Sequence, residues 1–290
     1  MTALIASDLD RTLIYSRRFF DTPPPTNQCV EIYRNEPISY MTPTAADLLR
    51  QLSSHHLIVP TTTRTTAQYT RLTLPGAPYR YAITSNGGTL LIDGAPDPQW
   101  TRTVAAQIRA GGPPLPHILA ELRTRIDDTW VHNLRTAENL FCYLVVDEAT
   151  LPPDFLTQWQ QWCTPRGWTV SQQGRKIYTV PQSLCKAKAV AALHHRLIDA
   201  GDLPPQSPIL AAGDGALDAA MLELAAAAIR PAHGELHSLD WQRPHLTVSD
   251  VTGARAAEDI LTWFAAQIPT ATPQPVQHSI AHPGERKDYR

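Results

Sequence analysis

The sequence predicts an α/β fold: a parallel, Rossmann-like sheet that carries an inserted α+β domain. Short apolar segments alternate with helical patterns at both ends of the chain, and this alternation is typical of parallel sheets covered by helices. Between residues 90 and 180 the pattern changes, and Pro-rich turns separate one strand-like and one helical stretch. A length of 290 residues fits about two domains at roughly 150 residues each.

The expected strands of the parallel sheet are short, and each runs into polar residues. The segment at residues 3–7 is apolar and leads directly into Asp8. Thr42 and Pro43 are typical of a helix N-cap and first helical residue, and apolar residues follow at helical spacing. The strands expected along the chain are residues 3–7, 57–59, 81–84, 209–212 and 227–229.

The composition excludes several classes of protein. Hydrophobic residues make up 43% and charged residues 18% of the chain, which is typical of a globular protein. The formal net charge of −2 provides no basic surface for nucleic acid or membrane. There is no membrane-length apolar run and no signal-peptide pattern, so we expect a cytoplasmic protein. The four cysteines are isolated, and we expect neither disulfides nor a zinc site.

Carboxylates and hydroxyls follow the predicted strands. In parallel sheets ligands bind beyond the carboxyl ends of the strands, and here those ends carry Asp8, Asp10, Thr62 and Asp214. Carboxylates as close as Asp8 and Asp10 repel each other unless a cation lies between them or one binds a proton. Asp218 follows Asp214 by one helical turn, so both can face the same side. Taken separately, each pair also fits solvated or helix-capping aspartates.

Four motifs follow one another along the chain: Asp8-Leu9-Asp10-Arg11-Thr12, residues 59–64 ending in Thr62-Thr63-Arg64, Lys186 at a helix start, and residues 213–218. Their residues and their order resemble the motifs of the haloacid dehalogenase-like (HAD) hydrolase superfamily. The resemblance covers roughly residues 1–265, and a Ser-Asn-Gly turn at residues 85–87 adds to it. The long insert between the second and third motifs resembles the subgroup that includes sugar-phosphate, sucrose- and mannosyl-3-phosphoglycerate phosphatases and phosphomannomutases.

The resemblance implies a domain organisation. We expect a HAD core of residues 1–89 and 181–268 and an inserted α+β cap of residues 90–180. We expect residues 269–290, which are rich in Pro, Gln and His, to form a flexible tail. The cap would cover the site and select the substrate.

The resemblance also implies catalytic roles. Asp8 would attack phosphorus and form an aspartyl-phosphate, and Asp10 would protonate the leaving alcohol and then activate water. Thr62 would donate a hydrogen bond to a phosphoryl oxygen, and Lys186 would balance charge. Alignment with the family's motifs favours Thr62 over its neighbouring threonines as the phosphate-binding hydroxyl. It also favours Lys186 over Lys188 as the lysine of the third motif.

The same resemblance implies a Mg²⁺ site and a phosphate pocket. Asp8, the carbonyl of Asp10 and Asp214 would bind the ion, and Asp218 would ligate it or orient the site. Arg11 replaces the usual glycine of the first motif, and it either contacts substrate or points to solvent. The candidate substrate-binding residues are Arg11, Thr12, Thr63, Arg64, Asn86 and Gly87.

The expected activity is hydrolysis of a small phosphorylated metabolite with Mg²⁺ as cofactor. The alternatives are a phosphomutase of the phosphomannomutase kind and a non-catalytic phospho-ligand sensor. The sequence names no substrate, and a homo-oligomer is compatible with it but not shown by it. We expect the long link at residues 15–42 to border the substrate. The candidate anion-binding residues of the cap are Arg102, Arg109, Arg123, Arg125, Arg135 and Arg175.

Overall fold

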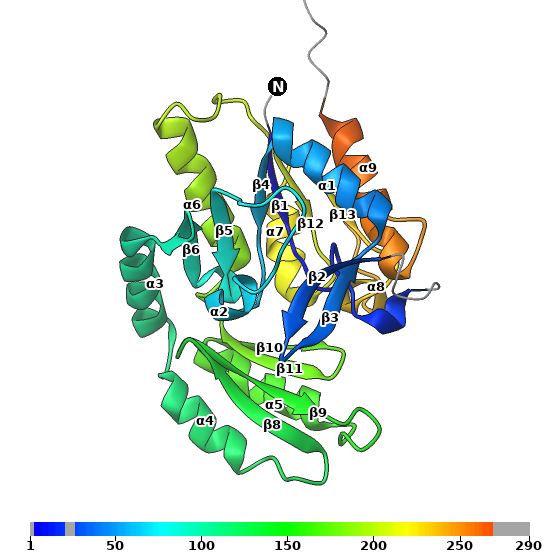
Figure 1. Ribbon diagram of the computed structural model, residues 1–290. Coiled ribbons are helices and arrows are strands. Elements are labelled where there is room, and N and C mark those ends of the chain that lie inside the picture. The colour runs from blue at the N-terminus through cyan, green and yellow to red at the C-terminus, as the bar shows by residue number, and fades with distance from the viewer. Residues whose placement is uncertain (1–2, 21–26, 269–290) are drawn as a thin grey trace, which may run out of the picture.

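The computed structural model describes residues 3–20 and 27–268 (Figure 1). The tail predicted at residues 269–290 lies outside the described residues. Within the described ranges, no helix combines the length and the apolar character that crossing a membrane requires.

A parallel sheet of five strands forms the centre of the core, in the order β14-β13-β12-β1-β4. This arrangement confirms the predicted fold class. Next to β4, a smaller antiparallel sheet contains β5, β6 and β7, and Thr61 links the two by a parallel bridge to Ile83. The strands are β1 (Leu4–Ser7), β4 (Leu57–Pro60), β5 (Tyr81–Thr84), β6 (Thr89–Ile92), β7 (Ala95–Pro96), β12 (Ile209–Ala212), β13 (Ala227–Arg230) and β14 (Leu246–Val248).

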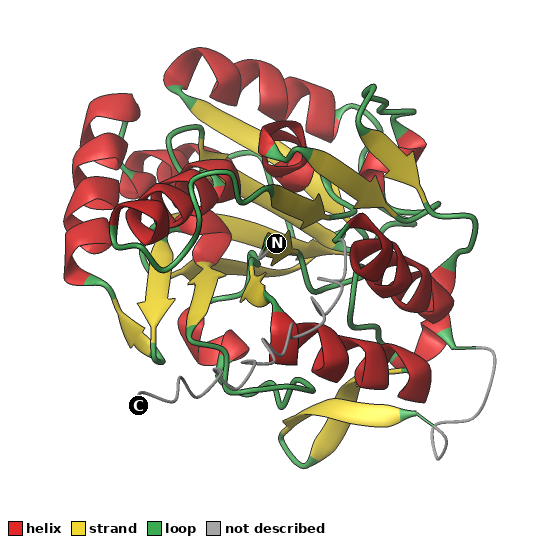
Figure 2. Ribbon diagram, turned by 90° about the horizontal axis from the view of Figure 1, so that it is seen from above, coloured by secondary structure: helices red, strands yellow, loops and turns green. Residues whose placement is uncertain are grey.

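Helices cover both faces of the core sheet (Figure 2). Successive side chains of a strand point to opposite faces, and Ile5 therefore packs with α1 and α9, whereas Leu4 and Ala6 pack with α6 and α7. Thr42 caps α1 as predicted, because its hydroxyl accepts a hydrogen bond from the Ala45 N–H at 3.1 Å. The core helices are α1 (Pro43–His55), α2 (Thr66–Tyr69), α6 (Lys186–Asp199), α7 (Ala219–Leu224), α8 (Glu235–Ser238) and α9 (Ala256–Gln267).

The chain between β7 and α6 forms an antiparallel sheet with helices on one face (Figure 1). Trp159 is fully buried beneath this sheet. We retain the division into core and cap as a proposal. The predicted boundary at residue 90 lies inside strand β6 of the core. The elements are α3 (Pro98–Gly111), α4 (Leu115–Arg123), α5 (Phe155–Cys163), and the strands β8 (Val131–Ala137), β9 (Phe141–Val146), β10 (Trp168–Gln173) and β11 (Lys176–Pro181), in the order β10-β11-β9-β8.

The link between β1 and α1 contains a two-stranded hairpin, β2 (Gln28–Tyr33) and β3 (Glu36–Met41). Tyr15 joins this hairpin to the core by a backbone bridge to Tyr40. The sequence predicted a long link here but not its structure. The hairpin lies over the carboxyl end of β1 (Figure 1), and its buried side chains therefore reach the candidate site.

Candidate active site

The polar residues predicted at the strand ends lie at one edge of the core sheet. Asp8 directly follows β1, and its N–H donates to the Ala212 carbonyl at 2.9 Å, so the strand pairing extends to the carboxylate. The Thr62 N–H donates to the Ile83 carbonyl at 2.8 Å. Asp214 lies two residues after the end of β12, and its N–H donates to Asp218 Oδ2 at 3.1 Å. Backbone hydrogen bonds therefore position Asp8 and Thr62, and a hydrogen bond from Asp218 holds the backbone at Asp214.

Lys186, the first residue of α6, lies between two carboxylates. Its Nζ donates to Asp8 Oδ1 and to Asp218 Oδ1, at 2.6 Å each, and the side chain is fully buried. Burial by itself would lower the pKa of Lys186, but the charges of Asp218 and Asp8 outweigh it and raise that pKa. Lys188, in contrast, lies at the surface and donates to the Ser183 carbonyl. Of the two lysines that the sequence offered, only Lys186 lies at the site.

Three buried aspartates form a candidate metal centre. Asp8, Asp214 and Asp218 each place a carboxylate oxygen within 4.8 Å of the others. Asp214 Oδ2 is buried and accepts no hydrogen bond from the described residues. Burial and the neighbouring carboxylates raise the pKa of Asp214 well above its usual value. Such crowding is relieved by a cation, and an all-oxygen donor set suits Mg²⁺, so these residues fit the ion.

Asp218 and Asp10, also predicted as metal ligands, have carboxylates that are engaged by other residues. Asp218 Oδ2 accepts from the N–H groups of Asp214 and Gly215, at 3.1 and 2.9 Å, and its other oxygen binds Lys186. This geometry favours an orienting role for Asp218 over direct ligation. The carboxylate of Asp10 lies outside the cluster, which is consistent with ligation through its carbonyl only.

Burial raises the pKa of Asp8 to about 7. Lys186 counteracts this shift, and Asp218 adds to it. Thr12 is fully buried and its hydroxyl donates to Asp8 Oδ2 at 3.4 Å. Thr12 therefore orients the carboxylate in this structure, and its predicted contact with the substrate stays a prediction.

Arg64 holds the side chain of Asp10. Its Nε and Nη2 donate to the two carboxylate oxygens at 2.7 and 2.8 Å, and its Nη1 donates to Glu31 Oε2 at 2.8 Å. Partial removal from water would raise the pKa of Asp10, but the Arg64 charge and hydrogen bonds outweigh this effect and lower it to about 2. Asp10 is therefore ionised here. Arg64, predicted to bind substrate, is occupied by two carboxylates.

Glu31, on β2, is a site residue that the sequence did not indicate. Its carboxylate is fully buried and accepts hydrogen bonds from Arg64, from Arg71 Nη2 at 3.0 Å and from Ser39 at 2.8 Å. No motif surrounds Glu31 in the sequence. Only the hairpin fold brings it beside the second motif.

The three consecutive threonines after β4 differ in their hydrogen bonds. The Thr61 hydroxyl donates to the Val59 carbonyl at 2.9 Å. Thr62 Oγ1 accepts from the Arg64 N–H at 3.1 Å, so its own proton remains available to a phosphoryl oxygen. Thr63 is buried next to it. These contacts agree with the choice of Thr62.

The Ser-Asn-Gly turn packs against the segment that leads into Lys186. Asn86 donates from Nδ2 to the Leu184 carbonyl at 3.0 Å. A Cβ at Gly87, whose φ is +92°, would lie 2.4 Å from the Cys185 carbonyl oxygen. In this structure Asn86 and Gly87 position the start of α6, and their predicted contact with the substrate stays a prediction.

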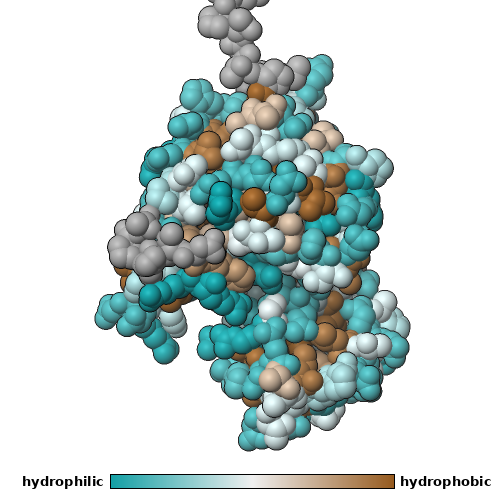
Figure 3. All heavy atoms as spheres, turned by 90° about the vertical axis from the view of Figure 1, so that its right-hand side faces the viewer, coloured by the Kyte–Doolittle hydropathy of each residue, from teal (hydrophilic) through white to brown (hydrophobic). Residues whose placement is uncertain are grey.

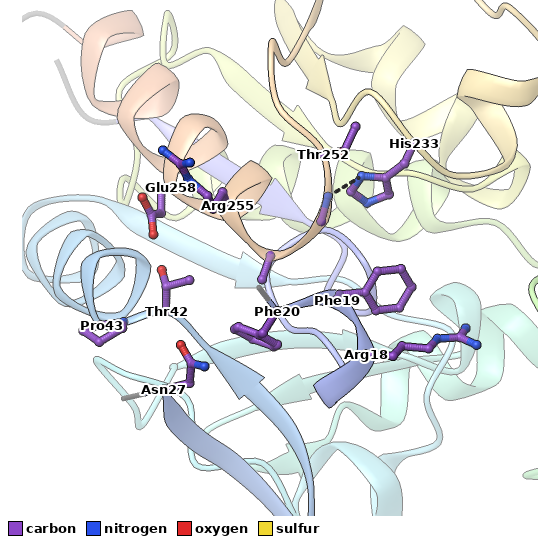
Figure 4. A pocket seen from close by; sticks show the side chains of 12 residues that line it. Arg18, Phe19, Phe20, Asn27, Thr42, Pro43, His233, Thr252, Arg255 and Glu258 are labelled. Atoms are coloured by element: carbon purple, nitrogen blue, oxygen red, sulfur yellow. Dashed lines mark hydrogen bonds between the residues drawn. The ribbon is translucent and has the colours of Figure 1, made fainter. Parts of the chain in front are cut away.

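Arg11 has a φ of 65°, in the left-handed region that favours the glycine usual in the first motif. Its Nε lies 3.5 Å from Asp214 Oδ2, so the side chain points toward the carboxylates. The imidazole of His233 donates from Nε2 to the Arg11 carbonyl at 2.9 Å. Its Nδ1 accepts from the Gly253 N–H at 3.3 Å (Figure 4). These two contacts define the neutral tautomer and support the unusual backbone of Arg11.

The cap contacts the loop that carries Asp214. Glu235 accepts hydrogen bonds from the Ser171 hydroxyl in β10 at 2.7 Å and from the Ala216 N–H at 2.9 Å. The Gln173 amide packs against Gly215, where a Cβ would lie 2.1 Å from Nε2. A cavity of about 240 Å³ remains between core and cap, and Asp10 lines it.

A larger cavity of about 710 Å³ shares Arg18 and Phe19 with this smaller one, and Figure 4 shows its lining. Phe20, Thr42 and Glu258 are among the side chains around it. None of the aspartates of the candidate site lines it, and we assign it no part in the chemistry.

Comparisons with known proteins identify the fold. No family model and no curated protein matches the sequence. The structure of sucrose-phosphatase from Synechocystis sp., solved with sucrose and phosphate, has a TM-score of 0.62 at 17% identity, covering 92% of this chain and 98% of that one. A HAD-superfamily phosphatase from Bacteroides thetaiotaomicron has a TM-score of 0.51 at 14% identity, covering 92% and 95%.

A subclass IIB sugar phosphatase of the HAD superfamily has a TM-score of 0.50 at 13% identity, covering 92% of this chain and 99% of that one. Each of these likenesses extends over core and insert together. They confirm the predicted fold, a HAD-type core with an inserted cap.

Proposed function

We propose that this protein is a Mg²⁺-dependent phosphomonoester hydrolase that acts on a small phosphorylated metabolite through an aspartyl-phosphate on Asp8. One observation carries the proposal: Asp8 is paired with the buried ammonium of Lys186 at 2.6 Å, and it places a carboxylate oxygen within 4.8 Å of one from Asp214. The proposed nucleophile Asp8, the ammonium of Lys186 and the proposed metal ligand Asp214 thus lie together. The likeness to phosphatases of known structure supports the same activity.

In the first half-reaction, a carboxylate oxygen of Asp8 forms a bond to phosphorus while the bond to the alcohol oxygen breaks. Lys186 offsets the repulsion between Asp8 and the phosphate dianion. Thr62 donates to a phosphoryl oxygen. Mg²⁺, held by Asp8, the Asp10 carbonyl and Asp214, would supply further positive charge to the phosphoryl group.

Asp10 handles the protons. The approach of a dianionic phosphate raises the pKa of a neighbouring carboxylate, which allows Asp10 to bind a proton and give it to the leaving oxygen. After this transfer Asp10 is again ionised, as it is in this structure. In the second half-reaction its carboxylate removes a proton from the water that attacks phosphorus. The bond between Asp8 and phosphorus breaks, which releases phosphate.

The test is phosphate release from a panel of sugar phosphates, nucleotides and phospho-acids, with and without Mg²⁺. We expect Mg²⁺-dependent release that falls at least a thousandfold in Asp8→Asn and stays near wild type in Asp128→Asn, an exposed residue of the cap. No release from any compound by folded protein would refute hydrolysis. A phosphorylated Asp8 without phosphate release would instead favour the phosphomutase.

We retain the cytoplasmic location expected from the sequence.

A further inference from the structure

We propose that the alcohol part of the substrate carries a second anionic group, bound by Arg18, Arg175 and Lys176 in the cavity between core and cap. This inference rests on the proposed phosphatase function and deepens it. It concerns the half of the substrate that leaves, since Asp10 is the residue that protonates the leaving oxygen and it lines the same cavity.

The cavity is small and is formed by both parts of the molecule. Its volume of about 240 Å³ lies just below the usual range of ligand pockets, so it fits a compact leaving group. The core contributes Asp10, Arg11 and Arg18, and the β10–β11 turn of the cap contributes Arg175 and Lys176. Figure 3 shows a hollow with hydrophilic side chains on its rim between the core and the cap below it.

The charges that line the cavity are strongly unbalanced. Arg11, Arg18, Arg175 and Lys176 are cations, whereas Asp10 is the single acidic residue among the lining residues. Both oxygens of Asp10 already accept hydrogen bonds from Arg64. Within residues 3–20 and 27–268, Arg18, Arg175 and Lys176 form no salt bridge. Arg18, Arg175 and Lys176 are exposed to solvent, and an anionic group bound among them would supply the negative charge that Asp10 alone does not balance.

Arg18 of the core approaches the β10–β11 turn of the cap. Arg18 Nη2 lies 3.8 Å from the position that a Cβ would take at Gly174, in the turn directly before Arg175. The guanidinium of Arg18 also lies over the Phe19 ring at 4.9 Å. The ammonium of Lys176 lies 5.8 Å from the centroid of the Tyr143 ring. Aromatic faces thus hold two of the cations at the cavity wall.

The use of lysine supports a specific role for residue 176. The chain contains lysine at positions 176, 186, 188 and 287 and otherwise uses arginine as its cation. Lys186 is committed to Asp8, and Lys176 lies in the cavity beside Asp10. Of the six cap arginines that the sequence offered as anion binders, Arg175 lines this cavity, whereas Arg125, for example, pairs with Glu121 on the outside of the cap.

The proposal separates this protein from one that accepts a neutral sugar. Its test compares pairs of esters in which one member carries an additional anionic group on the part that leaves. The first pair is glycerol 3-phosphate and 3-phosphoglycerate, in which a carboxylate replaces a hydroxymethyl group. The second pair, fructose 6-phosphate and fructose 1,6-bisphosphate, asks whether the second anion is a phosphate. We expect kcat/KM to be at least tenfold higher for the more anionic member of one pair.

The variants Arg18→Gln, Arg175→Gln and Lys176→Gln should each reduce this preference several-fold, and the double variant of Arg18 and Arg175 should abolish it. Arg166→Gln is the matched control, since Arg166 is an exposed cap arginine whose guanidinium lies over Trp162, away from the cavity. The preference should also decrease as salt is raised. Turnover of both members with equal kcat/KM would overturn the inference and leave the phosphatase function intact.

A binding measurement distinguishes failure of the proposed anion site from failure of the proposed phosphatase function. The Asp8→Asn variant is titrated with 3-phosphoglycerate, glycerol 3-phosphate and both fructose phosphates in the calorimeter, with Mg²⁺ present. Tighter binding of a more anionic ester by at least tenfold, lost in the double variant, would uphold the anion site even if the wild type hydrolysed none of these esters. Equal affinities within each pair would overturn it, whatever the wild type hydrolyses.

Discussion

Arg64 holds Asp10 by two parallel hydrogen bonds, from Nε and Nη2 to the two carboxylate oxygens, at 2.7 and 2.8 Å. A planar guanidinium matches a carboxylate in this way, and an ammonium does not. The third side of the same guanidinium binds Glu31 of the hairpin. The orientation of the proposed acid–base residue therefore depends on a motif in the core and on a hairpin in the link.

Replacement of Arg64 by lysine should impair the chemical step. Lysine keeps the charge but loses one of the two hydrogen bonds, so we expect kcat to fall about ten- to a hundredfold, in line with the usual contribution of general acid–base catalysis, while KM changes little. Arg71→Lys is the control, because Arg71 also binds Glu31 but does not contact Asp10. Equal losses in both variants would show that the contact with Asp10 is unimportant. Steady-state kinetics on one substrate decides this.

Removal of the Glu31 charge should destabilise the protein. In Glu31→Gln the buried part of Arg64 loses its second carboxylate, and breaking a buried ion pair costs about 3–5 kcal/mol. Arg71 is one-third exposed, so the loss of its ion pair with Glu31 adds little to the destabilisation. Glu36→Gln, an exposed residue of the same hairpin, should change the free energy of unfolding by less than about 0.5 kcal/mol. Urea denaturation of both variants measures the difference, and a change below about 1 kcal/mol in Glu31→Gln would contradict the network described here.

Replacement of Lys186 should abolish activity. Methionine has a similar length but leaves Asp8 and Asp218 without the cation between them, so we expect kcat to fall at least a thousandfold, since electrostatic stabilisation is commonly the largest catalytic contribution. Lys188→Met should retain near wild-type kcat, because Lys188 is exposed and donates only to a backbone carbonyl. Activity in Lys186→Met above a tenth of wild type would refute the assigned role. Circular dichroism would establish that both variants are folded.

Gly234 should be essential for metal binding. A Cβ at this residue would lie 2.6 Å from Asp214 Oδ2 and would displace that carboxylate. We expect Gly234→Ala to weaken Mg²⁺ binding about ten- to a hundredfold, as is usual when the support of a ligand is disturbed. Gly94→Ala is the matched control, since Gly94 has a similar φ of +79° but no atom within 4 Å of the added methyl. Mg²⁺ titration by calorimetry compares the two, and equal affinities would contradict the prediction.

Mg²⁺ should stabilise the folded protein through the same site. Binding to the native state alone adds about 2.7 kcal/mol when the ion is at a hundred times its Kd. Thermal unfolding should therefore shift to higher temperature with Mg²⁺ and return with a chelator. Asp214→Asn should lose the shift, whereas Asp250→Asn, at an exposed position, should keep it. A shift of the same size in Asp214→Asn would place the ion elsewhere.

The order of the motifs along the chain was sufficient to predict the core. Asp8, Thr62 and Asp214 each follow a short apolar segment, and strands of a parallel sheet end at a common edge. Lys186 was identified because its segment matches a motif at a helix start. These predictions depend on local sequence and on a general rule of sheet geometry, so the chain did not have to be folded to make them.

The sequence by itself determined the fold class and the residues that meet at the sheet edge, because local patterns and motif order encode both. Only the tertiary structure decided the partners of those residues. It placed Glu31 against Arg64, packed Asn86 and Gly87 against the segment that leads into α6, and brought Arg18 of the core and Arg175 of the cap to the wall of one cavity. These contacts join segments far apart in the chain, and no local pattern or spacing specifies which distant side chains pack together.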